Sequence, residues 1–270
     1  MKKNLLKKLI TTVIIGVMTF SLIGCSKTTE SASTLEKVKE SKKLVIGTSA
    51  DYPPYEFHKE INGKDEIVGF DVEIAKEIAK DLGVELEIKD MSFDGLLPAL
   101  KTGTIDMALA SMNPSEERKE SVDFSDIYYK AQNGVIVRKE DKDKYTTLDS
   151  LSGKKIGVQK GSIQQQFATT QIKNADIKAL SKITDLVMEL KNNKIDGIAI
   201  EMPVGEFYAE KNSDLSMTTC EFKTEEDLGS AIAVQKGEFQ FTEEINKTLN
   251  RLIKEDKISK FIVEANKMIE

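Results

Sequence analysis

The residue types that usually carry catalysis are scarce in this sequence of 270 residues, which contains one histidine, His58, and two cysteines, Cys25 and Cys220. A zinc site of histidines and cysteines is therefore nearly excluded. A Ser-His-Asp or Cys-His catalyst would have to use His58, which stands in a polar stretch typical of a surface loop. We predict neither a metal site nor a cofactor, and the residue types favour a binding protein over an enzyme.

Charge excludes a second class of function. The net charge is −6, with 40% hydrophobic and 31% charged residues. This is ordinary globular composition, and beyond the N-terminus we find no basic stretch interleaved with aromatic residues. The balance argues against a nucleic-acid partner.

Polar side chains follow several apolar runs of the sequence, at the points where predicted strands would end. They are Ser49 and Asp51 after 44–47, Ser111 after 105–110, Gly161 and Ser162 after 155–158, and Glu201 after 195–200. In open α/β sheets, ligands bind outside the carboxyl ends of the strands. We therefore expect these side chains to meet at one cleft, formed by loops from both halves of the chain.

The elements that must position them alternate between strand and helix. Besides the three apolar runs at 44–47, 105–110 and 155–158, strands are predicted at 84–88, 177–180 and 195–200, and helices at 72–82, 95–101, 162–171 and 184–191. Asp71 and Asp94 are expected to cap two of these helices, and Gly83 to end the first. This order predicts βαβ units and a largely parallel sheet.

The two halves also share letters, which suggests two lobes of similar build. Residues 99–110 align with 189–200 through a shared Leu-Lys pair and a shared Ile-Asp pair. A strand at 230–234 and amphipathic helices at 242–254 and 257–268 are expected to pack back on the first lobe. The chain would then cross between lobes near 128–132 and again near 224–228, and such a hinge permits closure around a ligand.

The first 24 residues predict an export signal, with four lysines and then an uncharged apolar run too short to span a membrane comfortably. The run ends at Leu22-Ile23-Gly24-Cys25, which resembles the lipobox of bacterial lipoproteins. That resemblance implies cleavage before Cys25, lipidation of its sulfur, and anchoring to the outer face of a bacterial cell membrane. Cleavage lowers the net charge to −10 and leaves Cys220 without a disulfide partner. Residues 25–42, rich in Ser, Thr, Lys and Glu near their start, are predicted to be a flexible tether, with a helical turn allowed at 35–40.

Several motifs in order resemble the polar amino-acid-binding proteins of ABC importers, the extracellular solute-binding proteins of family 3. They are 47–57 (GTSADYPPYEF), 69–73 (GFDVE), 93–100 (FDGLLPAL), 111–119 (SMNPSEERK), 122–125 (VDFS) and 151–158 with 161–162 (LSGKKIGV and GS). The resemblance covers residues 43–270. It implies a two-lobed α/β fold of the type II periplasmic-binding-protein class, with two parallel-rich sheets, flanking helices and a two-strand hinge. The first lobe would take 43–130 and 227–270, and the second 131–226.

The resemblance also implies a ligand site. Arg118 matches the family arginine that binds the ligand α-carboxylate, a task that suits the planar guanidinium fork, and the sequence has only three arginines. Ser111, Asn113 and Ser162, the last at a helix N-terminus, match further carboxylate contacts, and Met112 between the first two is also predicted to contact the ligand. Glu201 takes the position of the acid for the ligand ammonium. Tyr52 and Phe93 match the aromatic walls around the ligand side chain.

One position departs from the family pattern. Many members carry Asp where this sequence has Ser49, and that acid contacts the distal group of the ligand. Asp51 is two residues further on, and Tyr55, Glu56 and Gln159 are further candidates near this end of the site. The ligands that stay open are arginine, lysine, histidine, glutamine and cystine-like molecules. An aspartate or glutamate ligand is disfavoured, because no additional basic residue is evident near these motifs.

We therefore predict a monomeric, non-enzymatic module that binds an extracellular amino acid and delivers it to a membrane permease, which a separate ATPase chain powers. Two alternatives stay open. One is a sensory partner that docks on a signalling protein. The other is a dehydratase for cyclic acids on the same fold, which would need an acid or base in the cleft, with His58, Glu201 and Asp51 as candidates.

Overall fold

The computed structural model describes residues 32–224 and 228–269, and from Ser33 onward the described residues form one compact unit. The predicted signal peptide, 1–24, and the predicted lipidation site, Cys25, lie outside the described residues. Within the described ranges, no helix is both long enough and apolar enough to cross a membrane.

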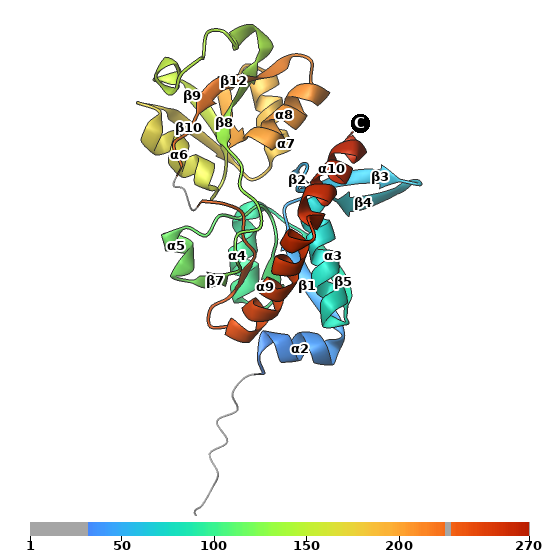
Figure 1. Ribbon diagram of the computed structural model, residues 1–270. Helices are drawn as coiled ribbons and strands as arrows, with labels where there is room; N and C mark the ends of the chain where they lie inside the picture. The colour runs from blue at the N-terminus through green and yellow to red at the C-terminus, as the bar shows by residue number, and fades with distance from the viewer. Residues whose placement is uncertain (1–31, 225–227, 270) are drawn as a thin grey trace, which may run out of the picture. The chain divides into compact units, whose positions relative to one another are not determined.

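Two five-stranded sheets form the framework (Figure 1). The first has the order β5-β1-β6-β13-β7 and the second the order β10-β9-β11-β8-β12. In each sheet the first three strands are parallel, and the fourth, β13 or β8, is antiparallel to both of its neighbours, so the parallel-rich prediction is confirmed. The strands of the first sheet are Lys43–Thr48 (β1), Glu85–Asp90 (β5), Met107–Ala108 (β6), Val122–Phe124 (β7) and Ala233–Gln235 (β13). Those of the second are Asn133–Arg138 (β8), Lys155–Gln159 (β9), Asp176–Leu180 (β10), Gly197–Glu201 (β11) and Leu215–Glu221 (β12).

Helices flank both sheets (Figure 1). With the first sheet go α2 (Thr34–Ser41), α3 (Phe70–Leu82), α4 (Phe93–Lys101), α5 (Glu116–Lys119), α9 (Phe239–Lys254) and α10 (Lys257–Ile269). With the second go α6 (Ile163–Gln171), α7 (Ile183–Lys191), α8 (Met202–Lys211) and two 3-10 turns, Lys139–Asp141 and Leu148–Leu151. The C-terminal helices α9 and α10 pack on α3, as the sequence predicted.

The internal repeat is real in three dimensions. Asp106 and Asp196, matched by the alignment, do the same task in the two sheets: each carboxylate accepts from the backbone N–H of the neighbouring strand, Val45 at 2.8 Å and Lys155 at 2.9 Å. Gly47 and Gly157 are matched as well. A Cβ on Gly47 would lie 2.5 Å from the Ile105 side chain, and one on Gly157 would lie 2.6 Å from the equivalent Ile195.

The chain passes between the sheets twice, from β7 to β8 and from β12 to β13. The two connections meet where Tyr129 and Ser230 form an antiparallel bridge. Tyr129 packs its ring edge-on against Tyr55 and Phe70, with centroids 5.7 and 5.4 Å apart. Both crossings therefore run beside an aromatic cluster of the first lobe.

Several local predictions are wrong. The tether does not reach residue 42, because Ser33 closes a capping box with Glu36 and starts α2, and Leu35 and Val38 are buried in the core. Asp71 does not cap α3, which begins after Gly69; it is a buried residue within the first turn.

Two further departures concern α4 and His58. Asp94 does not cap α4, whose N-cap is Ser92. The predicted polar loop at His58 is part of a hairpin, β3 (Glu56–Ile61) and β4 (Lys64–Val68), joined by a short β2 (Asp51–Tyr52). The sequence of this hairpin alternates too weakly between apolar and polar residues to distinguish it from a loop.

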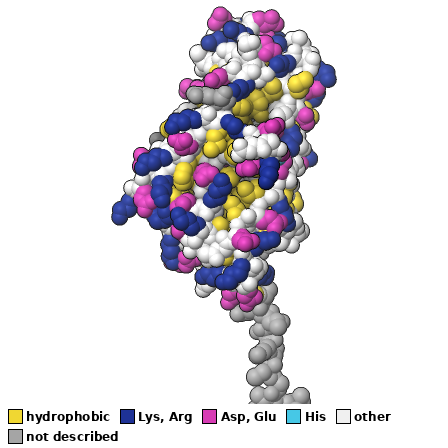
Figure 2. Space-filling view, turned by 90° about the vertical axis from the view of Figure 1, so that its right-hand side faces the viewer, with side chains coloured by type: hydrophobic (Ala, Val, Ile, Leu, Met, Phe, Trp, Pro, Cys, Tyr) yellow, Lys and Arg dark blue, Asp and Glu magenta, His cyan; other side chains and the backbone are white. Residues whose placement is uncertain are grey.

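Charged side chains of both signs surround a central band of apolar side chains on the face shown in Figure 2. Four large apolar residues of the described chain are markedly exposed: Met188, Phe239, Ile253 and Val263. This mixed surface is typical of a folded domain in water.

Gly69 makes the backbone turn that carries α3 toward the site. Its φ is +129°, and a Cβ there would lie 2.1 Å from the carbonyl oxygen of Tyr55. Because the obstacle is backbone, Gly69→Ala is expected to lower the free energy of unfolding by about 3 kcal/mol or more in urea denaturation. Gly83→Ala is the control: its φ is +70°, nothing described lies within 4 Å of the new Cβ, and the loss is about 1 kcal/mol. Equal losses would contradict this account.

Candidate functional site

A small closed cavity lies between the carboxyl ends of strands from both sheets. Its walls are Tyr52, Glu56, Phe93, Ala110, Ser111, Asn113, Gln159, Ser162, Ile163 and Gln164. Six of the predicted site residues are in this set: Tyr52, Phe93, Ser111, Asn113, Gln159 and Ser162. Strand order predicted Ser111 and Ser162 here, and the family resemblance suggested the other four; the fold brings all six to one cavity.

Glu201 adjoins this cavity through its neighbours. It ends β11, is 2% exposed, and its carboxylate accepts hydrogen bonds from the Tyr55 hydroxyl at 2.5 Å and from Ser111 Oγ at 3.2 Å. Tyr55 and Ser111 belong to the first lobe, so Glu201 reaches across from the second. Burial raises the pKa of this carboxyl to about 7, although the two hydroxyl donors oppose the rise.

Two more carboxyls are buried next to Glu201. Glu56 and Asp71 are each 1% exposed. Burial and the neighbouring Asp71 hold the pKa of Glu56 well above its usual range. Burial raises the pKa of Asp71 to about 6. One oxygen of each, Glu56 Oε2 and Asp71 Oδ1, has no hydrogen-bond partner among the described residues. This end of the site is therefore poor in positive charge and rich in buried acid.

Asp71 also ties the site to the first crossing. Its Oδ2 accepts from the backbone N–H of Ser111 at 3.0 Å and from the hydroxyl of Tyr128 at 2.8 Å. Ser111 has a φ of +47°, in the left-handed region that is uncommon for this residue type. The Asp71 carboxylate thus supports a strained residue that itself contacts Glu201.

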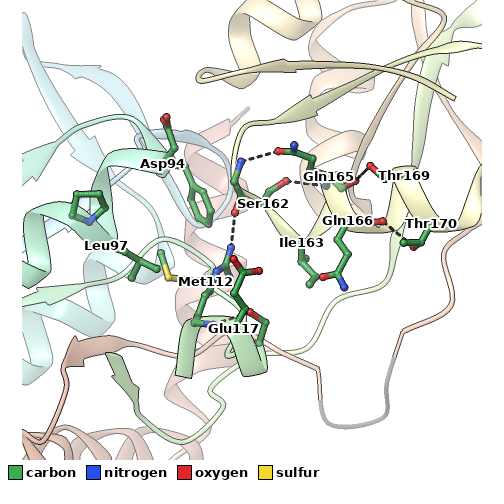
Figure 3. A pocket seen from close by; sticks show the side chains of 15 residues that line it. Asp94, Leu97, Met112, Glu117, Ser162, Ile163, Gln165, Gln166, Thr169 and Thr170 are labelled. Atoms are coloured by element: carbon green, nitrogen blue, oxygen red, sulfur yellow. Dashed lines mark hydrogen bonds between the residues drawn. The ribbon is translucent and has the colours of Figure 1, made fainter. Parts of the chain in front are cut away.

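Arg118 lines an adjoining, larger cavity of about 540 Å³. Figure 3 shows this cavity with Met112, Glu117 and Ser162 labelled. Its guanidinium donates to the Asn113 carbonyl at 2.7 Å and to the Gly161 carbonyl of the second lobe at 2.8 Å. It also lies 5.4 Å from the centre of the Phe93 ring. Desolvation lowers the pKa of Arg118 to about 10. Its two hydrogen-bond acceptors are neutral carbonyls, and the charge that acts on it is the neighbouring Glu117 carboxylate.

The remaining predicted residues have distinct positions. Ser162 is the N-cap of α6 and accepts from the Gln165 N–H, as predicted. Gln159 is buried, and its side-chain nitrogen has no partner among the described residues. The Asn113 amide donates to the Gly229 carbonyl of the second crossing at 3.1 Å. Met112 lines the larger cavity beside Arg118.

Asp51 lines neither of these two cavities. Its carboxylate instead accepts from the backbone N–H of Ile183, at the start of α7, at 2.6 Å. Its carbonyl accepts from the Tyr208 hydroxyl of α8 at 2.8 Å. Both partners belong to the second lobe, so Asp51 forms a contact between lobes.

His58 lies away from both cavities, on β3. Its ring nitrogens face Asp65 at 2.9 Å and Asp90 at 3.4 Å. Nowhere in the described chain do three histidine, cysteine or acidic side chains converge as a metal site would require. Cys220 is buried and unpaired.

Comparison with known proteins decides the family. The model of the bacterial extracellular solute-binding proteins, family 3, matches residues 44–264. The chain belongs to this family. It has the two-lobed type II periplasmic-binding-protein fold, and members of this family act outside the cytoplasm.

Three relatives show how close the match is. The arginine-binding extracellular protein of Bacillus subtilis (strain 168) is 39% identical over 249 residues, covering 92% of this chain and 93% of its own. A crystal structure of an amino acid ABC transporter substrate-binding protein from Streptococcus pneumoniae, bound to L-arginine, has a TM-score of 0.84 and 37% identity, covering 87% and 98%. An ancestral amino-acid-binding protein described as a precursor of cyclohexadienyl dehydratase has a TM-score of 0.77 and 30% identity, covering 86% and 99%.

Sequence reasoning named Glu56 only as a neighbour and missed Asp71 and Tyr128 as parts of the site of this family 3 protein. Asp71 looked like a helix cap because it precedes an apolar periodic run. A usable signal was the acid at 56 between aromatic residues, Tyr55 and Phe57, since a charged side chain in such a stretch needs a special partner. Its proximity to Asp71 is a matter of tertiary structure.

The acidic end makes the stability of the ligand-free protein depend on pH. The folded state keeps a proton on Glu201 up to about pH 7, whereas the unfolded state releases it near 4.5. The free energy of unfolding therefore falls as the pH rises through that window. We expect the wild type to lose about 3 kcal/mol more than Glu201→Gln between pH 4.5 and 8, measured by urea denaturation.

The matched control is Glu206→Gln, an exposed acid on α8, which should follow the wild-type pH curve. Parallel curves for the wild type and Glu201→Gln would show that Glu201 ionises normally in the folded protein.

Proposed function

We propose that this protein binds a cationic amino acid, of the arginine or lysine type, between its two lobes and delivers it to an ABC importer. Amino-acid binding for import is the function of its relatives, and the chain shares it. The observation that carries the finer proposal is the charge layout of the site. A guanidinium whose hydrogen bonds go to neutral carbonyls, with the Glu117 carboxylate as its charged neighbour, lines one cavity, and three buried carboxyls lie at or beside the adjoining one.

Arg118 supports binding of the ligand carboxylate. Guanidinium offers five N–H donors, and the two carbonyl contacts leave others available. A carboxylate next to it would form a charge-assisted hydrogen bond and neutralise a desolvated cation. The N-terminus of α6, capped by Ser162, is near enough to line the same cavity and favours an anion as well.

The acidic end supports binding of one or two positive groups. Burying a carboxylate is costly unless a proton or a cation compensates it. In the described chain, Glu201 and Asp71 accept from hydroxyl and amide groups. The carboxyls of Asp71 and Glu56 also interact with each other, and one Glu56 oxygen is unpartnered. We assign the ligand ammonium to Glu201 and the distal cation to Glu56. Tyr52 and Phe93 would flank the side chain between them.

Contacts between the lobes support a binding cycle with closure. Arg118 and Gly161, and Tyr55 and Glu201, bond directly across them. The small cavity has far less space than an amino acid needs. We propose that the lobes, 43–130 with 227–270 and 131–226, part about the two crossings to admit the ligand. The permease and its ATPase would be separate chains, and the protein a monomer anchored by lipid on Cys25.

The site also bears on the enzyme alternative. The ancestral relative shows that this fold is compatible with evolution toward a dehydratase. His58, however, is on the hairpin and contacts Asp65 rather than either cavity. The carboxyls of the acidic end are engaged in holding Ser111, Tyr55 and Tyr128. We propose binding without turnover, and no observation favours the sensory role over import.

Arg118 is the first residue to test. Arg118→Ala should weaken the binding of arginine by about thirtyfold or more, because a buried carboxylate would lose its cation. Arg118→Lys should retain part of the affinity, since it keeps the charge and loses the fork. Isothermal titration calorimetry on protein unfolded and refolded to remove ligand measures both. Arg251→Ala, on α9, is the control because Arg251 pairs with Glu77 and Asp81. Unchanged affinity in Arg118→Ala would refute the assigned role.

Glu56 is the residue that tests the ligand class. Glu56→Gln should weaken arginine and lysine by about tenfold or more while leaving glutamine unchanged or improved, because only the cations lose a charge partner. Glu60→Gln, an exposed acid on the same strand, should change neither. Equal losses for arginine and glutamine in Glu56→Gln would mean that Glu56 has only a structural role.

A further inference from the structure

Two equivalent strands, β1 in the first sheet and β9 in the second, are each followed by a loop that contacts a helix of the other lobe. The repeat that matches Gly47 with Gly157 and Ile105 with Ile195 also matches the loop after β1 with the loop after β9, and α4 with α7. In one contact, Asp51 meets the start of α7. In the other, Lys160 and Gly161 meet the start of α4. The two contacts are thus reciprocal.

The Asp51 contact is buried and supplies an acceptor for backbone N–H groups in the first turn of α7. The N-cap residue of this helix, Lys182, makes no side-chain cap hydrogen bond. Asp51, 7% exposed, accepts from the Ile183 N–H at 2.6 Å and from the Thr184 N–H. Its other oxygen accepts from Ser49 Oγ at 3.3 Å. A carboxylate from one lobe therefore supplies the cap of a helix in the other, where the helix dipole also favours it.

The reciprocal contact has the charges exchanged. Lys160 on the loop pairs with Asp94 on α4 at 2.8 Å, and Asp94 lies against Gly161, 3.5 Å from where a Cβ would stand. The Lys160 side chain is 58% exposed, so this ion pair is screened by water and weak. Of the two contacts, the Asp51 cap is the one that can hold the lobes together.

We propose that Asp51 is a positioning residue that holds the two lobes in their closed arrangement by capping α7, and that it sets ligand affinity without contacting the ligand. The inference rests on the proposed function. Asp51 follows β1 and α7 follows β10, so parting of the lobes breaks the cap. The Tyr208 hydroxyl, which donates to the Asp51 carbonyl, breaks away with it. The free energy of the cap is thus available only in the closed arrangement, and it slows release of whatever is enclosed.

A series at position 51 separates capping from ligand contact, because asparagine caps helices as well as aspartate and alanine does not. In the full chain, stripped of ligand, Asp51→Ala should raise the Kd and the release rate of arginine by about fivefold or more, and by the same factor for lysine and for glutamine. Asp51→Asn should stay within about threefold of the wild type. Asp143→Ala, an exposed acid outside the site, is the control for charge.

Hydrogen exchange at the Ile183 amide, measured with arginine bound so that the lobes are closed, tests the cap directly. It should be about fivefold or more faster in Asp51→Ala than in the wild type, while the amides of β9 are unchanged. An unchanged release rate and unchanged Ile183 exchange in Asp51→Ala would overturn the proposal. So would an Asp51→Asn variant as weak as Asp51→Ala for arginine but normal for glutamine, because that pattern assigns Asp51 to the ligand.

The proposed function fails separately, when the wild type binds no amino acid. In that event the wild type shows no binding of arginine, lysine or glutamine at all, whereas failure of the cap leaves wild-type binding intact and makes Asp51→Ala equal to it in release rate and in Ile183 exchange.

Discussion

Burial of carboxyl groups at the junction of the two lobes is the constraint on which the rest of this structure depends. Glu56, Asp71 and Glu201 are each withdrawn from water, and a carboxylate there must be protonated, hydrogen-bonded or paired with a cation. The groups that donate hydrogen bonds to these acids are the hydroxyls of Tyr55 and Tyr128 and the backbone amide of Ser111. Those donors are enough to hold the acids in place and too few to neutralise them. The imbalance raises their pKa values, and it makes the site complementary to a positive group.

The same groups connect the site to the crossings between lobes. Asp71 reaches Tyr128, which precedes the bridge between Tyr129 and Ser230, and Ser111 contacts Ser230 Oγ at 3.0 Å. Recognition and hinge are therefore parts of one hydrogen-bond network. A cationic ligand group bound next to the acids changes the charge of this hydrogen-bond network. Because the network includes residues of the crossings, ligand binding can affect the segments about which the lobes would move.

Arg118 and Asp51 show two ways in which a charged side chain can serve a two-lobed site. Arg118 spans the lobes through carbonyl oxygens and keeps donors for a ligand. Asp51 accepts hydrogen bonds from the opposite lobe: its carboxylate accepts from the start of α7, and its carbonyl accepts from the Tyr208 hydroxyl. The first is suited to recognition and the second to closure. Both were predicted as ligand contacts, and only their surroundings in three dimensions distinguish the two roles.

The sequence by itself determined the two-lobed α/β fold, the repeat, the strand ends that form the cleft, and most residues that line it. Hydrophobic periodicity and the positions of Gly, Ser and Asp are local properties, and they predicted the alternating elements and the strand ends. The two-lobed fold class and most of the lining residues were predicted from the resemblance to a known family. Only the tertiary structure decided which acids share the buried end, that Asp71 supports Ser111 rather than capping α3, that α2 belongs to the core, and that Asp51 caps a helix far along the chain. These outcomes depend on contacts between residues distant in sequence, and on the desolvation that follows when such residues are packed together. Neither quantity is present in any local pattern.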